Sequence, residues 1–240
     1  MQIVAWNCNM ALHAKVGALA RLSPDIAIIA ECAKPETVTK KNSTFRPTSS
    51  DWVGDYPHKG LGVFSFGPWQ IARSPDFDST IRFAIPLVVS GPESFHLLAL
   101  WACYPQKRGS RYTFKGPSRD AIERYGAFLR AAPSVIVGDL NNNVKWDKPG
   151  AAANHSVFVN MLDRDLDLVS AYHTHGGHPQ GDEPHNTLFW MKSKSNEYHI
   201  DYCFVPRRWT DRLCDVSVGE RDKWLSISDH APLSVMVSGP

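Results

Sequence analysis

Two patterns of apolar residues recur along the chain. Continuous apolar runs predict strands, and apolar residues at helical spacing predict helices. Nearly continuous apolar runs at 2–6 (QIVAW), 25–30 (DIAIIA) and 134–139 (SVIVGD) are typical of strands buried inside a sheet. Between the first two runs, residues 13–22 have apolar positions at helical spacing. The chain is therefore expected to open with a strand, a helix and a neighbouring strand.

The central part of the chain, 52–102, reads as strands only. Ser94 to Ala102 is almost wholly apolar, as expected for a strand covered on both faces. A helix is predicted after Ser118, which is placed to cap it, and a second helix is predicted over 154–163. Further strands are predicted at 166–172, 186–190, 199–205, 214–219 and 232–238.

This order of elements predicts an α/β protein with two packed β-sheets and helices outside each sheet. The sequence contains no clear linker, low-complexity tract or short repeat. We therefore expect one domain over residues 1–240.

Composition narrows the class of protein. Hydrophobic residues make up 43% of the chain and charged residues 21%, and the net charge is only +2. These values are ordinary for a globular protein and exclude a strongly basic nucleic-acid coat protein. No apolar run approaches the ~20 residues of a membrane span. The opening residues read as a strand rather than a signal peptide. Five cysteines without a CxxC pair suggest free buried thiols and a cytoplasmic location.

Polar residues stand at the ends of several apolar strands. A carboxylate at such a position is costly to bury unless it meets a cation or hydrogen-bond donors. Singly, these residues would be read as turn formers or helix caps. Together they predict one oxygen-rich pocket, which suits Mg²⁺ or Mn²⁺. The set comprises Asn7, Asn9, Glu31, Asp139, Asn141, Asp201, Asp229 and His230.

Five motifs carry a resemblance to a known family. They are WNCN (6–9), the IIAE run ending at Glu31, VGDLN (137–141), HIDYCFVP (199–206) and SDHAPL (228–233). In this order they resemble the endonuclease/exonuclease/phosphatase superfamily, including the exonuclease III type and stand-alone bacterial members. The resemblance implies a deoxyribonuclease I-like fold, which is a four-layer α/β/β/α sandwich. It also implies hydrolysis of phosphoester bonds with a divalent metal.

The resemblance assigns a role to each motif residue. Glu31 would be the main metal ligand, with Asn7 and Asp229 nearby. Asp139 and Asn141 would hold the attacking water and the phosphate. His230 would contact the scissile phosphate and would be held by Asp201, which fixes its tautomer and favours the charged form. Asn9 is a candidate substrate contact.

The chain departs from this family at one strand end. Many relatives carry His or Tyr at the end of the strand that here reads LLALWACYP, where Trp101, Cys103 and Tyr104 compete for the place. Tyr104 could assist the leaving group. A histidine acid of the deoxyribonuclease I type is absent from this strand, so a close match to that branch is not expected.

Three further features suggest substrate contacts. The loop 106–119 mixes basic residues, among them Lys107, Arg108 and Arg111, with aromatic ones, which suits a phosphate backbone and unstacked bases. A solvated loop is the alternative interpretation. Trp146 is read as a ligand contact. A histidine-rich loop that no strand or helix fixes is read as a substrate-side loop rather than a zinc site; it contains His173, His175, His178 and His185.

The sequence thus predicts a metal-dependent phosphodiesterase, most simply a nuclease acting on DNA or RNA. One alternative is a phosphatase for a small phosphoester such as an inositol phosphate or a lipid headgroup. A second is a catalytically silent phosphate-binding module, against which the intact acidic set argues. Nothing in the sequence indicates a protein partner.

Overall fold

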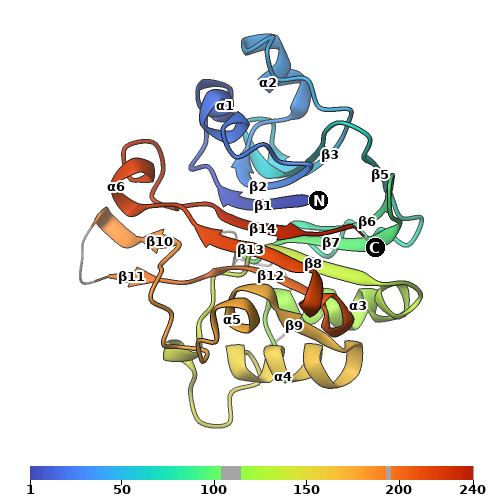
Figure 1. The fold of residues 1–240 in the computed structure, drawn as a ribbon, viewed down its shortest axis with the longest axis vertical. Coiled ribbons are helices and arrows are strands. Elements are labelled where there is room, and N and C mark those ends of the chain that lie inside the picture. Colours follow the sequence, from blue (N-terminus) through green and yellow to red (C-terminus); the bar gives the residue numbers. More distant parts are fainter. Residues whose placement is uncertain (104–114, 193–195, 240) are drawn as a thin grey trace.

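A computed structural model describes residues 1–103, 115–192 and 196–239 and shows two six-stranded sheets packed face to face (Figure 1). The first sheet has the order β13 (Leu213–Val218), β14 (Leu233–Val237), β1 (Gln2–Asn7), β2 (Ile26–Cys32), β4 (Lys59–Ser65) and β3 (Ser49–Tyr56). The second has the order β5 (Gln70–Arg73), β6 (Ala84–Ser90), β7 (Phe95–Trp101), β8 (Ser134–Asp139), β12 (Asp201–Pro206) and β9 (Leu168–Ser170). A small sheet pairs β10 (Leu188–Phe189) with β11 (Glu197–Tyr198).

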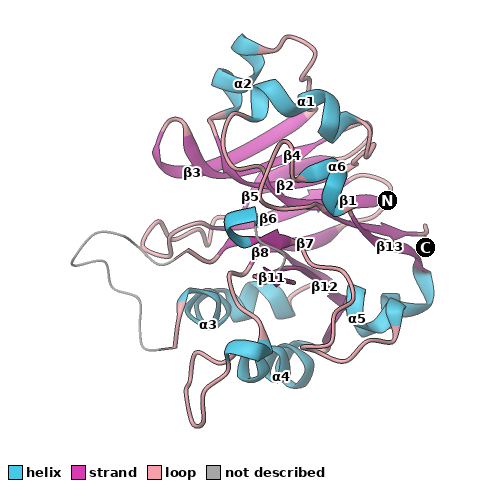
Figure 2. Ribbon diagram, turned by 90° about the vertical axis from the view of Figure 1, so that its left-hand side faces the viewer, coloured by secondary structure: helices cyan, strands magenta, loops and turns pink. Residues whose placement is uncertain are grey.

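Helices cover the outer face of each sheet (Figure 2). The first sheet carries α1 (Leu12–Ala20), α2 (Pro35–Lys41) and α6 (Arg221–Trp224). The second carries α3 (Pro117–Arg130) and α4 (His155–Leu166), whereas α5 (Ala171–Gly176) lies beside β12 of the second sheet and β13 of the first. Short 3₁₀ turns are η1 (Val144–Trp146), η2 (Trp190–Lys192) and η3 (Arg207–Arg212). The predicted four-layer α/β/β/α sandwich is confirmed.

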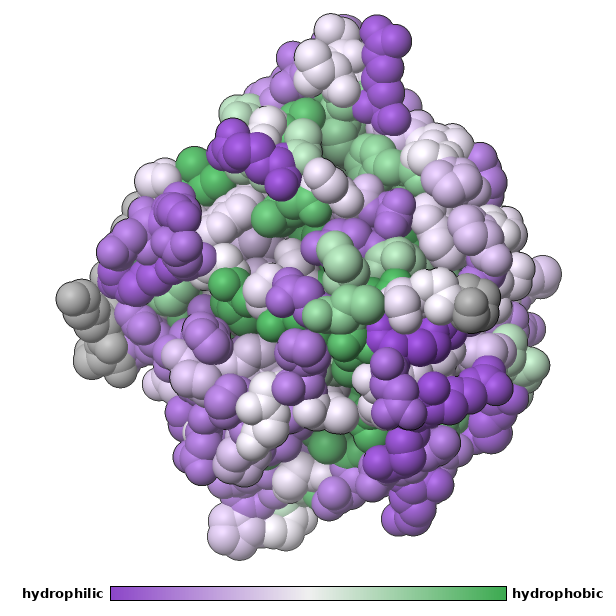
Figure 3. Space-filling model, in the orientation of Figure 1, coloured by the Kyte–Doolittle hydropathy of each residue, from purple (hydrophilic) through white to green (hydrophobic). Residues whose placement is uncertain are grey.

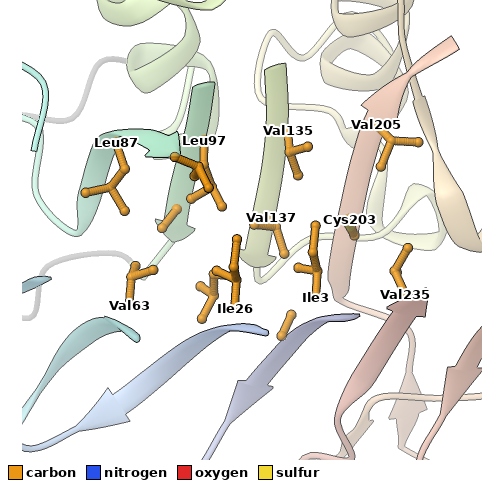
Figure 4. Close-up of a cluster of buried hydrophobic side chains, with 14 of the residues drawn as sticks. Ile3, Ile26, Val63, Leu87, Leu97, Val135, Val137, Cys203, Val205 and Val235 are labelled. Carbon is orange, nitrogen blue, oxygen red and sulfur yellow. The ribbon is translucent and has the colours of Figure 1, made fainter. Parts of the chain in front are cut away.

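Alternation along each strand divides the apolar residues between the layers. In β1, Ile3 packs between the two sheets, whereas Val4 packs beneath the outer helices. In β8, Val135 and Val137 face the first sheet, whereas Ile136 packs under α3 and α4. Figure 4 shows valine, leucine and isoleucine side chains of the two sheets meeting in the central layer. Both faces of these strands are therefore buried, which explains why their sequences are apolar without a break.

Polar and apolar residues are mixed on the face drawn in Figure 3, where hydrophobic residues form small groups between hydrophilic ones. No helix in the described part of the chain is long and apolar enough to cross a membrane. The five cysteines are free, as predicted, but only three of them are buried, because Cys103 is half-buried and Cys214 is exposed.

Several element boundaries differ from those predicted. Ser118 does not cap α3, because the helix already begins at Pro117 and Gly116 precedes it without a side-chain cap. Proline suits this first helical position, since its fixed φ angle is already helical and no hydrogen bond is lost. The run 80–90 (TIRFAIPLVVS) reads as one strand, but residues 80–83 lie before β6, and Ala171 starts α5 rather than continuing β9. The helices α2, α5 and α6 were not predicted.

Glycine at position 138 is required by the close approach of two parallel strands. A Cβ atom there would lie 1.9 Å from the carbonyl oxygen of Leu100, and the φ angle of Gly138 is +144°. Any side chain would therefore push β8 away from β7. The residue after this contact is Asp139, so the glycine sets the position of a candidate site residue.

Candidate active site

One cavity of about 540 Å³ collects residues from both sheets at a single edge of the sandwich. The candidate residues that line it are Asn7, Glu31, Asn141, Asp229 and His230. Asn7 ends β1, Glu31 lies near the end of β2, and His230 precedes β14. Strand pairing explains the grouping, because Asn7 is opposite Ala30 in the parallel β1–β2 ladder.

Asp139 and Asp201 lie directly behind this cavity. They are paired residues in the antiparallel ladder of β8 and β12, and both are buried. Such a pair of carboxylates must be balanced by donors or by positive charge. The structure supplies both kinds of partner, from Asn7 for one carboxylate and from His230 for the other.

Glu31 reaches the cavity because β2 is irregular at this point. The pairing of β2 with β4 shifts register between Ile29 and Cys32, and Glu31 itself has a φ angle of 59°. A left-handed conformation is unfavourable for glutamate, and strained residues of this kind are found at functional sites. The Glu31 carboxylate forms an ion pair with Lys59, whose Nζ lies 2.9 Å from Glu31 Oε2.

Asn7 bridges carboxylates of the two sheets. Its Nδ2 donates to Asp139 Oδ2 at 3.0 Å and lies 3.5 Å from Glu31 Oε1. Its side-chain oxygen accepts the backbone N–H of Asn9 at 3.0 Å. The other Asp139 oxygen accepts the N–H of Asn141 at 2.9 Å. These bonds fix the end of β8 against the end of β1.

His230 is held by three polar contacts. Its Nδ1 lies 2.8 Å from Asp201 Oδ2, its backbone N–H donates to Ser228 Oγ, and its carbonyl accepts from Trp6 Nε1. Ser228 in turn donates to the carbonyl of Asn7 at 2.8 Å. The imidazole is therefore oriented by Asp201 on one side and by the β1 strand on the other. This arrangement fixes the Nδ1 proton toward the carboxylate.

The surroundings change the pKa values of two of these groups. Burial, followed by the nearby charge of Asp201, raises the pKa of Asp139 to about 7. Burial by itself would lower the pKa of His230, but the charge and hydrogen bond of Asp201 outweigh it and raise the pKa to about 9. At neutral pH the imidazole is therefore charged, and Asp139 is poised to exchange a proton.

The donor set fits a divalent cation of the Mg²⁺ or Mn²⁺ kind. Glu31 and Asp229 present carboxylate oxygens to the cavity, and hard cations prefer such ligands. Among the described residues, a different set brings three ligand atoms within 4.8 Å of one another, namely Asp139, Asp201 and His230. His230 Nδ1 and Asp201 already bond to each other, and Asp139 and Asp201 do not line the cavity. Glu31 and Asp229 are therefore the carboxylates that open to it.

Other residues that line the cavity are aromatic or basic. They include Tyr56, Lys59, Arg82, Phe83 and Trp190. Arg82 forms an ion pair with Asp55. The ring of Phe83 packs against the ring of Trp101, with 4.6 Å between centroids. An apolar sugar or base can lie against such rings while the adjacent cations meet phosphate.

Two of the three residues that compete for the end of the LLALWACYP strand line this cavity. They are Trp101 and Cys103, and the ammonium of Lys59 lies 5.5 Å from the Trp101 ring centroid. An indole cannot act as a useful proton donor. This strand end therefore contributes the apolar Trp101 ring, over which the Lys59 ammonium lies. Tyr104 lies outside the described residues.

Other predicted contacts lie elsewhere. The Asn9 side chain is exposed, and Asn9 is not among the residues that line the cavity. Trp146 lines a second cavity of about 290 Å³ that shares Asn141 with the first. Its ring also packs on Tyr198 at 4.7 Å, and 38% of its surface is exposed. Three predicted basic contacts, Lys107, Arg108 and Arg111, lie outside the described residues.

The histidine-rich loop is more ordered than its sequence suggested. His173 and His175 are part of α5, and His173 is buried with bonds to Ser170 and Glu183. His185 is bonded to the hydroxyl of Tyr172. Within the part of the chain that is described, these histidines do not form a three-ligand metal group.

Sequence reasoning missed several residues of the site. Lys59, Arg82 and Trp190 lie on turns or at strand ends whose sequences carry no motif. Thr187 was also missed, although its hydroxyl accepts the N–H groups of both Ile200 and Asp201 at 3.0 Å. Thr187 and Trp190 lie shortly before the HIDYCFVP motif (199–206), but no motif stands near Lys59 or Arg82 in the sequence.

Comparison with known proteins supports the fold. No protein-family model matches the chain, and no curated protein matches it in sequence. A 3'-5' exonuclease (NExo) from Neisseria meningitidis has a TM-score of 0.69 at 18% identity, covering 99% of this chain and 100% of that chain. The AP endonuclease LMAP from Leishmania major has a TM-score of 0.70 at 12% identity, covering 100% and 88%.

A third structure carries the superfamily name. An endonuclease/exonuclease/phosphatase from Beutenbergia cavernae has a TM-score of 0.62 at 16% identity, covering 100% of this chain and 72% of that chain. The chain therefore shares the fold of these proteins, the deoxyribonuclease I-like α/β/β/α sandwich that the resemblance of its motifs led us to expect.

Proposed function

We propose that this protein is a divalent-metal-dependent phosphodiesterase that hydrolyses phosphodiester bonds in DNA or RNA. The observation that carries the proposal is the single cavity into which Glu31, Asp229, Asn141 and His230 all open, backed by the Asp201–His230 contact. Carboxylates, amides and a charged imidazole around one space form a site for a phosphate and a cation.

Each side chain has a role in this reaction. Glu31 and Asp229 hold Mg²⁺ or Mn²⁺, with Asn7 beside them. The bound cation would neutralise phosphate charge and acidify a water molecule. Asp139 accepts a proton from the attacking water, for which a pKa of about 7 suits it. Asn141 and the charged His230 bind phosphate oxygens as negative charge develops on them.

Nucleic acid is favoured as the substrate by the width of the site. The two cavities meet at Asn141, so a strand cut at the first could continue across the second past Trp146. The structurally similar proteins include a 3'-5' exonuclease and an AP endonuclease, which agrees with this substrate. Residues 1–240 would act as one domain, because the terminal strands β1 and β14 pair with each other. The buried free thiols suit the reducing cytoplasm.

The second candidate is a phosphatase for a smaller phosphoester, including a terminal phosphate. A further structure of the Neisseria protein, 18% identical to this chain with a TM-score of 0.66 over 99% of both chains, is described as a 3' phosphatase bound to product DNA hairpin. The aromatic residues of the cavity, with Lys59 and Arg82, could accept a single terminal group. A silent phosphate-binding module is the third candidate.

The test is a panel of DNA, RNA, small diesters and monoesters with Mg²⁺ or Mn²⁺. A nuclease should show affinity that falls steeply with salt, because each neutralised phosphate releases counterions. Changing Lys107, Arg108 and Arg111 together to alanine should reduce the log–log salt slope by up to about 0.9 per lost contact on duplex DNA. Turnover of a small diester should survive. Cleavage of a small phosphoester alone would favour the phosphatase, and no cleavage at all would favour the silent module.

A further inference from the structure

A buried polar network behind the active site links the histidine-rich segment to both catalytic strand ends. Its centre is Glu183, which is only 6% exposed. One carboxylate oxygen, Oε1, accepts three donors: the N–H of Gly181 at 2.7 Å, His173 Nε2 at 3.1 Å and Asn143 Nδ2 at 3.3 Å. His173 is itself held by Ser170 at 2.8 Å, so the carboxylate is fixed from the side of β9 and α5.

Asn143 is the link from Glu183 to the loop after β8. This side chain is fully buried and follows Asn141 by two residues. Its Nδ2 also donates to the carbonyl of His199 at 2.9 Å and lies 3.4 Å from the hydroxyl of Tyr202. Its Oδ1 accepts the N–H of Lys145 at 2.9 Å. The Asn143 amide therefore anchors the loop that carries Asn141, together with the Asn142 amide, which donates to the carbonyl of Ala153 at 3.0 Å.

The same network reaches the second catalytic strand. His199 precedes Asp201 by two residues. Its carbonyl accepts from both Asn143 and the hydroxyl of Tyr202, and its Nδ1 is bonded to the carbonyl of His185 at 2.9 Å. A displacement of Asn143 would therefore affect the start of β12 as well as the end of β8.

The charge of Glu183 is maintained by its donors. Burial would raise its pKa, but the hydrogen bonds from His173 and from the backbone of Gly181 outweigh this effect and lower the pKa to about 2. The side chain is thus an ionised acceptor at neutral pH. Hydrogen bonds to a buried charged group are stronger than neutral ones and hold their partners more firmly.

We propose that Glu183 is a positioning residue, which acts through Asn143 to hold Asn141 and Asp201 in their catalytic arrangement. The proposal rests on the phosphodiesterase function for its kinetic consequence, but its structural consequence is independent of any activity. Small displacements of groups that bind a reacting phosphate are costly, and 1 Å can reduce the rate by about 10²-fold.

The experiment compares Glu183→Ala, Glu183→Gln, Asn143→Ala and the double alanine variant with the wild type. We expect Glu183→Ala to lower kcat at least about tenfold, with KM and metal affinity within about twofold, because the fault lies in geometry. Glu183→Gln keeps an acceptor oxygen and should recover most of the rate. The double variant should be no slower than the slower single variant, because both changes break one link.

A matched control is Ser134→Ala. Ser134 is buried and donates to the carbonyl of Leu129 at 2.6 Å, at the opposite end of β8. This change should lower the melting temperature but leave kcat unchanged below the unfolding transition. If it lowers kcat as much as Glu183→Ala does, the effect is one of general stability and the proposal is wrong. A glutamine variant no better than alanine, or fully multiplicative losses in the double variant, would also overturn it.

Amide hydrogen exchange separates this proposal from the proposed function. Exchange over residues 140–146 should rise in Glu183→Ala and Asn143→Ala but not in Ser134→Ala, whether or not the protein cleaves any substrate. Asn143→Ala breaks the same contact from the other side, so it carries the test if Glu183→Ala does not fold. Unchanged exchange in a folded variant would overturn the proposal even in an active enzyme.

Discussion

Separating Asp201 from His230 should slow the reaction strongly without unfolding the protein. The two side chains are buried and 2.8 Å apart. Asp201→Asn keeps the shape and removes the charge that raises the pKa of His230 to about 9. Relative to the ordinary value of about 6.5, that shift represents about 3 kcal/mol in favour of the charged ring. The variant would therefore present a neutral imidazole to the phosphate at neutral pH.

We expect kcat to fall by about 10²–10³ in Asp201→Asn and in His230→Ala, the loss typical of one positioned donor. The assay is steady-state cleavage of an oligonucleotide and of a small diester with Mn²⁺. His96→Ala is the control, since this ring stacks on Phe128 at 4.0 Å and bonds to its carbonyl at the far end of β7. The double variant should be about as slow as the slower single variant, because the two residues act as a unit. Independent, multiplicative losses would refute the coupling.

Three further predictions concern charge. Glu31→Gln should abolish Mg²⁺ or Mn²⁺ binding in calorimetry and slow turnover; undiminished activity in chelated wild-type protein would contradict a metal role. Lys59→Met should tighten metal binding by up to about fivefold. The reason is that a partly exposed ion pair, worth at most about 1 kcal/mol, no longer competes with the metal for Glu31. Weaker metal binding in this variant would show that Lys59 does not compete with the metal. The pKa of Glu183 is lowered to about 2 from 4.5, so its stabilisation, about 3 kcal/mol, is present above pH 4.5 and lost as the pH falls toward 2. The difference in unfolding free energy between the wild type and Glu183→Gln should shrink as the pH falls from 4.5 toward 2. A difference that stays constant would contradict this stabilising role of the ionised Glu183.

Much of the fold was predictable because buried strands leave a plain pattern. Strands β1, β7 and β8 are covered on both faces, so most of their residues are apolar on both faces. Helices α2 and α6 escaped prediction because they are short and polar, with one buried side chain each, Val38 and Trp224. Their signals are at the ends instead, such as proline at the start of α2 and lysines in its last turn.

Site residues that end strands could be predicted from the sequence. Site residues that reach the cavity from turns could not. Glu31 and Asp139 follow apolar runs in different sheets, so their approach at one edge of the sandwich could be expected. The pairing of Asp201 with His230 came from family resemblance rather than from any spacing. Glu183 and Asn143 are 40 residues apart, and their contact depends on how the segment after α5 folds back. No local pattern records a contact of that kind.

The position of β14 beside β1 has a consequence for the synthesis of this protein. The strand order places residues 233–237 between β13 and the first strand of the chain, and the amino group of Met1 donates to the carbonyl of Val237 at 2.7 Å. A ribosome synthesises the chain from its first residue onward. Asn7 therefore emerges long before Asp229 and His230, and the site can form only after these two residues have been made. An incomplete nascent chain lacks Asp229 and His230, two of the residues that line the cavity. If the protein has the proposed function, its active site would therefore be incomplete until β14 had emerged and closed the sheet.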